Sequence, residues 1–172
     1  LNDPLPPEKE WKMNVEQRLR SKGIVLPDIS GPNYYGLTYG PMKTHQIVGN
    51  VLFMSAHAPI ADGKILHPGR IGKTVSIEQG YEAARLTGIN MLAGIKAALG
   101  DLDRVKGIIR CLCFVACEPD FTDIHKVSTG CSDVLIEAFG EEAGRGGRAT
   151  IGVQSLCDSL CFEIRPEVEI KA

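Results

Sequence analysis

The sequence predicts an α+β or βαβ domain whose helices pack on one mixed β-sheet, and three observations support this fold class. Apolar residues alternate with the period of strands between Tyr34 and Ala58. Two longer stretches, 76–99 and 122–139, repeat their apolar residues at helical spacing, and an apolar run at 105–117 separates them. Because a helix follows a strand twice, we expect both long helices on one face of the sheet.

Length and composition limit the chain to one main domain. With 172 residues and 44% hydrophobic content, the chain can bury one good core but is too short for two ordinary domains. We expect residues 1–30 to form a helical extension and residues 31–172 to form the domain. The extension should be an amphipathic helix that opens at Pro6, carries Trp11 and ends at Gly23, and that either clasps the domain or binds a partner.

Turn and capping signals define the first elements of the domain. Two residue pairs typical of tight turns stand in this half of the chain, Gly49-Asn50 and Asp62-Gly63. The first pair joins strands expected at 46–48 and 51–54. Ser76 and Gln79 have the spacing of a capping box, and Gly100 is expected to end the helix that they begin.

The second half of the chain contains one long apolar strand and the elements that follow it. The continuous apolar run from Cys111 to Ala116 predicts that the strand at Val105–Cys117 is covered on both faces. Gly140 is expected to stop the second long helix. We expect this helix at Thr122–Phe139 and, after it, a glycine-rich loop at Glu141–Gly147 that closes over a functional site. Two strands, Arg148–Gln154 and Cys161–Ile170, should then form a final hairpin.

Charge and hydropathy exclude several kinds of partner. The net charge of −2 and the pI near 6.1 give no basic field, so we expect no nucleic-acid partner. No run approaches the roughly 18 apolar residues of a membrane helix, so we expect no membrane partner. The start Leu1-Asn2-Asp3-Pro4 lacks a basic and then apolar leader, and we expect a soluble, cytoplasmic protein.

The cysteines and histidines do not have the spacing of a metal site. None of the six cysteines belongs to a paired C-x2-C motif, so we interpret them as reduced, mostly buried thiols. The other candidate ligands are also dispersed along the sequence: His45, His57, Asp62 and His67. We therefore expect neither a metal nor another cofactor.

Arg148 is the most informative single residue. It begins an apolar strand, where a planar and permanently charged guanidinium contributes nothing to a core. A guanidinium is shaped to hold a carboxylate through two parallel hydrogen bonds, which makes Arg148 a candidate substrate clamp. The alternative is a solvated arginine that protects a strand edge from pairing with other chains.

The order and spacing of several short motifs resemble the YjgF/RidA family, the reactive-intermediate imine deaminases also called L-PSP endoribonucleases. The motifs are Gly49–Pro59, Gln79 and Asn90 in the first long helix, Gly100–Val105, Asp120-Phe121, Arg148 and Glu163. The chain is similar to the branch of that family with a longer N-terminus. The resemblance implies a chorismate-mutase-like fold, a homotrimer and sites in the clefts between subunits.

The resemblance also assigns the candidate site. It implies that Arg148 holds a substrate carboxylate and that Glu163 positions a water molecule. The implied substrate-binding residues are Tyr34 or Tyr35, Ser55, Ala56, His57, Thr129 and Thr150. Several depart from the family pattern: Ser55-Ala56-His57 replaces Ser-Gly-Gln, Thr129 replaces an asparagine and Thr150 replaces a cysteine.

His57 and the closing strands each leave two interpretations open. His57 could donate protons near its usual pKa of about 6.5, or it could be a packed histidine under a loop. A tight turn at Cys157-Asp158 would pair Glu163 with Gly152, about 13 Å along the ladder from Arg148. The two residues could then share a ligand only through a bulge, a longer loop or a neighbouring subunit. Arg165-Pro166 indicates an edge strand or a bulge.

These observations favour an enzyme that hydrolyses a small 2-imino acid to a 2-oxo acid and ammonia, as a homotrimer without a cofactor. The main alternative is a non-catalytic protein of the same fold that binds a small carboxylate, in which Ala56, His57 and Thr129 have changed the pocket. A weaker alternative is the endoribonuclease of the family's older name, which the missing basic groove disfavours.

Overall fold

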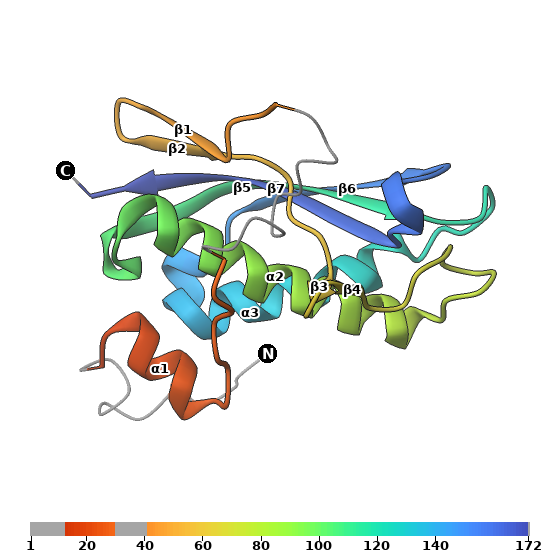
Figure 1. Cartoon of the computed structure of the whole chain (residues 1–172), viewed down its shortest axis with the longest axis horizontal. Helices are drawn as coiled ribbons and strands as arrows, with labels where there is room; N and C mark the ends of the chain where they lie inside the picture. The colour runs from red at the N-terminus through yellow and green to blue at the C-terminus, as the bar shows by residue number, and fades with distance from the viewer. Residues whose placement is uncertain (1–12, 30–40, 172) are drawn as a thin grey trace.

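A computed structural model describes residues 13–29 and 41–171 and confirms the predicted α+β class. Figure 1 shows a sheet with both long helices, α2 and α3, on one face. The short helix α1 lies beyond them and packs against α3 (Figure 1). Within the described residues, no helix is both long enough and apolar enough to span a membrane.

The main sheet has the strand order β1-β2-β7-β5-β6. Its strands are β1 (His45–Val48), β2 (Val51–Met54), β5 (Val105–Ala116), β6 (Gly147–Val153) and β7 (Phe162–Ile170). β5 pairs in parallel with β6 and antiparallel with β7. The predicted final hairpin is therefore wrong. The long apolar β5 takes the position between the last two strands, where both of its edges are paired.

The two predicted tight turns are confirmed. Gly49, with a φ of 61°, lies in the turn that joins β1 to β2. Asp62 and Gly63, with φ angles of 50° and 71°, join the short strands β3 (Ile60–Ala61) and β4 (Lys64–Ile65). Positive φ at both central residues is the geometry of a type I′ turn, which matches the twist of an antiparallel pair.

Helix α2 spans Ile77–Leu99 and begins with the predicted capping box. The Gln79 amide donates to the Ser76 hydroxyl at 3.2 Å, and the Ser76 amide donates to Gln79 Oε1 at 2.9 Å. Gly100 ends the helix with a φ of 81°. These local signals were sufficient to predict both ends of α2.

Helix α3 spans Ile124–Gly144, which is longer than predicted. Gly140 interrupts it with φ 81° and ψ 173°, but a further helical turn follows, so the predicted loop Glu141–Gly147 is wrong. A Cβ atom on Gly144 would lie 2.4 Å from the carbonyl oxygen of Leu135, so only glycine lets this last turn fold back onto the helix.

Helix α1 spans Val15–Ser21, and Asn14 caps its first turn. The prediction of one helix from Pro6 is wrong at its start, whereas Gly23 follows its end as expected, with a φ of 76°. Trp11 lies outside the described residues. The buried Arg18 donates from Nε and Nη2 to the carbonyl of Ala138 in α3, at 2.9 and 2.7 Å, which supports the clasp interpretation. The division of the chain at residue 30 stays a prediction.

The core lies between the sheet and the two long helices. In β5, Cys111, Cys113 and Val115 face the helices and are buried, whereas Leu112 and Phe114 face away and are only partly buried. Among the described residues, the predicted coverage of β5 on both faces is thus wrong. The six cysteines are free thiols, as predicted, and five are buried.

We call the surface opposite the helices the open face of the sheet. Exposed or half-exposed apolar side chains lie on it: Val51, Phe53, Leu112, Phe114 and Ile151. Charged residues of β7 alternate with its buried ones and also belong to this face: Glu163, Arg165, Glu167 and Glu169. An apolar strand face that the described residues leave uncovered is a common sign of association.

Candidate functional site

The two predicted central residues, Arg148 and Glu163, lie on opposite faces of the sheet. Arg148 pairs with Cys111, which faces the helices, and Glu163 pairs with Phe114, which belongs to the open face. Directly paired residues project to the same side of a sheet. The expected pairing of Glu163 with Gly152 is wrong, because β5 separates the two strands. One chain by itself therefore does not bring Arg148 and Glu163 together.

Arg148 is supported by helix α3. Its Nη1 donates to the hydroxyl of Ser132 at 2.7 Å. One helical turn earlier, the hydroxyl of Ser128 shares a 2.7 Å hydrogen bond with that of Thr150. Ser128 is fully buried, so this pair fixes β6 against α3. We call Arg148, Thr150, Thr129, Ser128 and Ser132 the Arg148 half of the site.

The Arg148 guanidinium has no ion-pair partner in the described part of the chain, and its residue is exposed. It lies near the thiols of Cys111 and Cys113. Burial raises the pKa of each thiol to about 12, although Arg148 acts in the opposite direction. These thiols are therefore neutral, and the charge of Arg148 is available to an external anion.

Thr129 is half-buried on α3, where the family resemblance placed it in the site. Its hydroxyl donates to the carbonyl of His125 one turn back, at 2.9 Å. The hydroxyl proton is thus used within the helix. Thr129 offers a ligand an acceptor but no free donor, unlike the asparagine of the family pattern.

The remaining predicted residues gather around β2 and β7. The amide of His57 donates to the carbonyl of Ile164 at 2.9 Å, and the amide of Ile164 donates back at 3.0 Å. This bridge holds Ser55, Ala56 and His57 beside Glu163, and we call these four residues the Glu163 half of the site. Tyr34 and Tyr35 lie outside the described residues.

Pro166 explains how this bridge arises. The β2–β7 ladder ends at Phe53 and Glu167 and resumes at His57 and Ile164, so the segment from Phe53 to His57 contains one residue more than the opposing segment of β7. In an antiparallel strand, every second residue forms its backbone hydrogen bonds with the same neighbouring strand. Ile164 bonds toward β2, so Pro166, two residues later, also points toward β2, where the ladder is interrupted. The missing N–H group of Pro166 therefore costs no hydrogen bond of the ladder. The bulge predicted at Arg165-Pro166 is present on the neighbouring strand, whereas the predicted edge strand is wrong because β7 is internal.

His57 is a packed residue that does not titrate near neutral pH. Only 3% of it is exposed, and burial lowers its pKa from 6.5 to about 4, although a bond to the Ser55 carbonyl acts in the opposite direction. Nδ1 lies 3.0 Å from that carbonyl, which only accepts, so Nδ1 carries the proton. The hypothesis of a proton donor near pH 6.5 is wrong.

Gly94 of α2 makes room for the imidazole. A Cβ atom at this position would lie 2.3 Å from Nε2 of His57. Gly94 was not among the residues predicted for the site. A glycine in the middle of a long amphipathic helix was the available signal, because such a glycine costs helix stability and requires a packing reason.

Glu163 is half-buried on the open face. Burial raises the pKa of its carboxyl, and the nearby Arg165 acts in the opposite direction. A carboxylate with a raised pKa is a stronger base than an exposed one, and it accepts hydrogen bonds from water more strongly.

One group of acidic residues has the spacing of metal ligands within the described residues: Glu16, Asp101 and Asp103. Protein groups already engage these carboxylates. Asp103 accepts from the amide of Val15 at 3.1 Å, Asp101 accepts from the amide of Asp103 at 2.8 Å, and Glu16 lies 3.4 Å from Lys96. Asp101 caps the turn that precedes β5, and Asp103 joins this turn to the start of α1.

Known proteins define the family of this chain. Residues 16–164 match the family described as "YjgF/chorismate_mutase-like, putative endoribonuclease". Protein TCP17 of Trypanosoma cruzi is 33% identical over 158 residues, covering 91% of this chain and 94% of TCP17. The crystal structure of Atu1372 from Agrobacterium tumefaciens is 34% identical with a TM-score of 0.80, covering 91% and 92% of the two chains.

A more distant structure shows the same fold. The E. coli protein TdcF, solved with bound serine, is 20% identical with a TM-score of 0.55, and the match covers 77% of this chain and 90% of TdcF. The chain belongs to the YjgF/RidA family, and its architecture is the chorismate-mutase-like fold of that family.

Proposed function

We propose that this protein is an imine deaminase whose active sites form between the subunits of a homotrimer. The observation that carries the proposal is the placement of Arg148 and Glu163 on opposite faces of one sheet. Neither half is complete alone. If the open face of one subunit covers the β6 edge of the next, both halves reach one cleft.

The open face supports such an assembly. It carries partly exposed aromatic and aliphatic side chains, among them Phe53 at 41% and Ile151 at 43%. Two or more copies that cover these side chains would gain roughly 25 cal/mol per Å² of apolar area removed from water. A closed ring uses one interface repeatedly and leaves no edge exposed. Sedimentation of the untagged protein at micromolar concentration should give about three times the monomer mass.

The proposed reaction has three requirements: the substrate carboxylate is held, a water molecule is directed at the imine carbon, and the leaving nitrogen is protonated. Arg148 holds the carboxylate of a 2-imino acid through two hydrogen bonds, and Ser132 fixes the guanidinium from behind. Glu163 orients a water molecule toward the imine carbon and accepts one of its protons. The nitrogen gains protons as the carbon–nitrogen bond breaks, so that imine and water give a 2-oxo acid and ammonia. No covalent enzyme intermediate is required.

A second candidate is a protein that only binds a small carboxylate. Thr129 favours it, because its hydroxyl proton is used within α3 and the asparagine donor of the family pattern is absent. The serine bound to TdcF is a small molecule with a carboxylate, which fits both candidates. Endoribonuclease activity is the weakest candidate, since the net charge of −2 provides no basic surface for RNA.

Three measurements separate the three candidates. Freshly generated 2-imino acid is mixed with the protein, and formation of the 2-oxo acid is compared with the uncatalysed rate. Acceleration that disappears in Arg148→Ala supports the deaminase. Binding of 2-oxo acids without acceleration supports the binding protein. Cleavage of a labelled RNA, with no effect on imines, would overturn both.

A further inference from the structure

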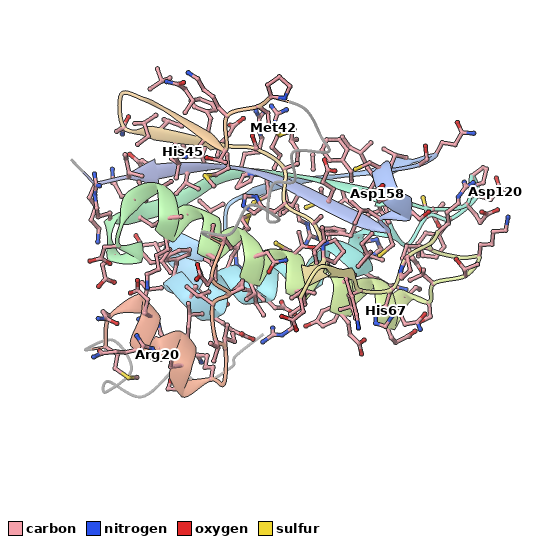
Figure 2. The ribbon with its side chains drawn as sticks, in the orientation of Figure 1. Arg20, Met42, His45, His67, Asp120 and Asp158 are labelled. Carbon is pink, nitrogen blue, oxygen red and sulfur yellow. The ribbon has the colours of Figure 1, made fainter. Side chains whose placement is uncertain are left out.

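A small hollow of about 240 Å³ adjoins the Glu163 half on the open face. Its polar lining consists of Lys43, His45, Gln46, Ser55, Arg165 and Glu167. Ser55 belongs both to this hollow and to the Glu163 half, and its hydroxyl donates to the carbonyl of Lys43. Figure 2 labels His45 at the start of the β1–β2 hairpin. We call this hollow the Arg165 pocket.

The strand register places Arg165 beside Glu163. Glu163 pairs with Phe114 and Arg165 with Leu112, so the two residues project from the same face of β7, about 7 Å apart along the strand. Burial raises the pKa of the Glu163 carboxyl, and the positive charge of Arg165 opposes this shift, as expected for neighbouring side chains on one strand face. Any subunit that completes a site around Glu163 therefore meets Arg165 as well.

The charges around the pocket leave it positive. The one carboxylate in its lining, Glu167, is engaged by Arg110 at 2.6 Å. Lys43 donates to the neutral amide of Gln46 at 2.8 Å. In the described part of the chain, neither Lys43 nor Arg165 forms a salt bridge, and the nearest acid to Arg165 on its own strand face is Glu163. The lining of the pocket itself therefore carries two cations and one carboxylate that Arg110 already pairs.

We propose that the Arg165 pocket binds a second anionic group, so that the preferred substrate is a short-chain dicarboxylic 2-imino acid. This inference rests on the proposed function. A monocarboxylic imino acid has one anionic group, which Arg148 holds. Two further cations beside the reacting centre serve no purpose for an apolar side chain and disfavour its burial. A carboxylate on a short chain matches their charge and fits the small volume of the pocket.

Binding of three ligands tests the inference. Isothermal titration measures the affinities of 2-oxoglutarate, of 2-oxoglutaramate, in which a neutral amide replaces the distal carboxylate, and of 2-oxobutyrate. The proteins compared are the parent, Arg165→Gln and Lys43→Gln. Arg20→Gln removes an exposed arginine of α1 and serves as the matched control. The assembly state of each variant is measured in parallel by sedimentation.

The parent and Arg20→Gln should bind 2-oxoglutarate about tenfold more tightly than the two other ligands, as expected for one charge-assisted contact. Arg165→Gln should abolish this preference and leave the affinity for 2-oxobutyrate unchanged. Equal affinity of the parent for all three ligands would show that the Arg165 pocket does not bind a second anionic group. The proposed function would not be affected by that result. If Arg165→Gln breaks the assembly without changing the preference, Arg165 pairs with a neighbouring subunit and the inference is wrong. If no 2-oxo acid binds the assembled protein, the proposed function fails and this inference fails with it.

Discussion

The two halves of the site differ in how far one chain completes them. In the Arg148 half, α3 and β6 supply both the functional group and its support, through the Ser132 and Ser128 hydroxyls. In the Glu163 half, the backbone bridge between His57 and Ile164 fixes the residues, but the carboxylate stands on an open face. The Arg148 half is thus prebuilt, whereas the Glu163 half depends on association. Activity should therefore fall when the contacts within the Arg148 half are mutated. The Glu163 half should contribute to activity only when the subunits assemble.

Loss of the clamp should have the largest effect. Arg148→Ala removes a charged contact to the substrate, which typically costs about 2–5 kcal/mol. We expect kcat/KM to fall at least tenfold, with no change in the mass of the assembly. Arg145→Ala is the matched control, since that nearby exposed arginine pairs only with Glu141 among the described residues. Deamination by Arg148→Ala at the parent rate would show that Arg148 does not hold the substrate carboxylate.

Acid should weaken the Glu163 half through His57. The pKa of His57 is about 4 in the folded protein and near 6.5 when unfolded. Between these values the unfolded chain binds the additional proton, so stability is present above pH 6.5 and falls as the pH drops toward 4. The full loss is about 3 kcal/mol for one buried group. Denaturant unfolding of the parent and of His57→Gln should show this loss in the parent alone.

The same packing predicts a second result. Because His57 stays neutral above pH 5.5, its replacement by glutamine should leave the pH profile of 2-oxo acid binding unchanged between pH 5.5 and 8.5. A profile that differs between the parent and His57→Gln in this range would show that the imidazole titrates in the site after all.

Filling the space opposite His57 should have a smaller effect. Gly94→Ala places a methyl group 2.3 Å from the imidazole, which must shift. Overpacking of this kind typically costs about 1–3 kcal/mol. We expect a lower midpoint of thermal unfolding for Gly94→Ala, and a smaller decrease when the same change is made in His57→Ala. Equal effects in both backgrounds would mean that the glycine is needed for another reason.

Removal of the support behind the clamp should have the smallest effect. Ser132→Ala deletes one hydrogen bond to Arg148, worth about 1 kcal/mol, so we expect KM to rise about fivefold with little change in kcat. Ser132→Thr, which keeps the hydroxyl, should restore the parent value. Ser155→Ala removes an exposed hydroxyl elsewhere and should change nothing.

Local signals in the sequence were sufficient for the local structure. The Ser76 capping box, the Gly49 turn and the Asp62-Gly63 turn each depend on neighbouring residues, and each is confirmed. The strand order could not be predicted in the same way. An apolar run such as Cys111–Ala116 fits a central strand under several topologies, and only the packing of the whole sheet places β5 between β6 and β7.

The site shows the same limit. Family motifs identified Arg148, Glu163 and the Ser55-Ala56-His57 segment, because those residues occupy recognisable positions in the sequence. Their supports were missed. Ser132 and Gly94 act through contacts between elements far apart in the chain, and even the unusual mid-helix position of Gly94 does not indicate which residue packs against it.

Complementation between two inactive variants tests most directly whether the site is shared by two subunits. Arg148→Ala and Glu163→Gln are each expected to be inactive, and they are refolded together so that mixed trimers form. If each site takes Arg148 from one subunit and Glu163 from the next, random mixing should restore about one quarter of the parent activity. Mixed trimers, verified by mass spectrometry, that are no more active than either variant alone would contradict the shared site.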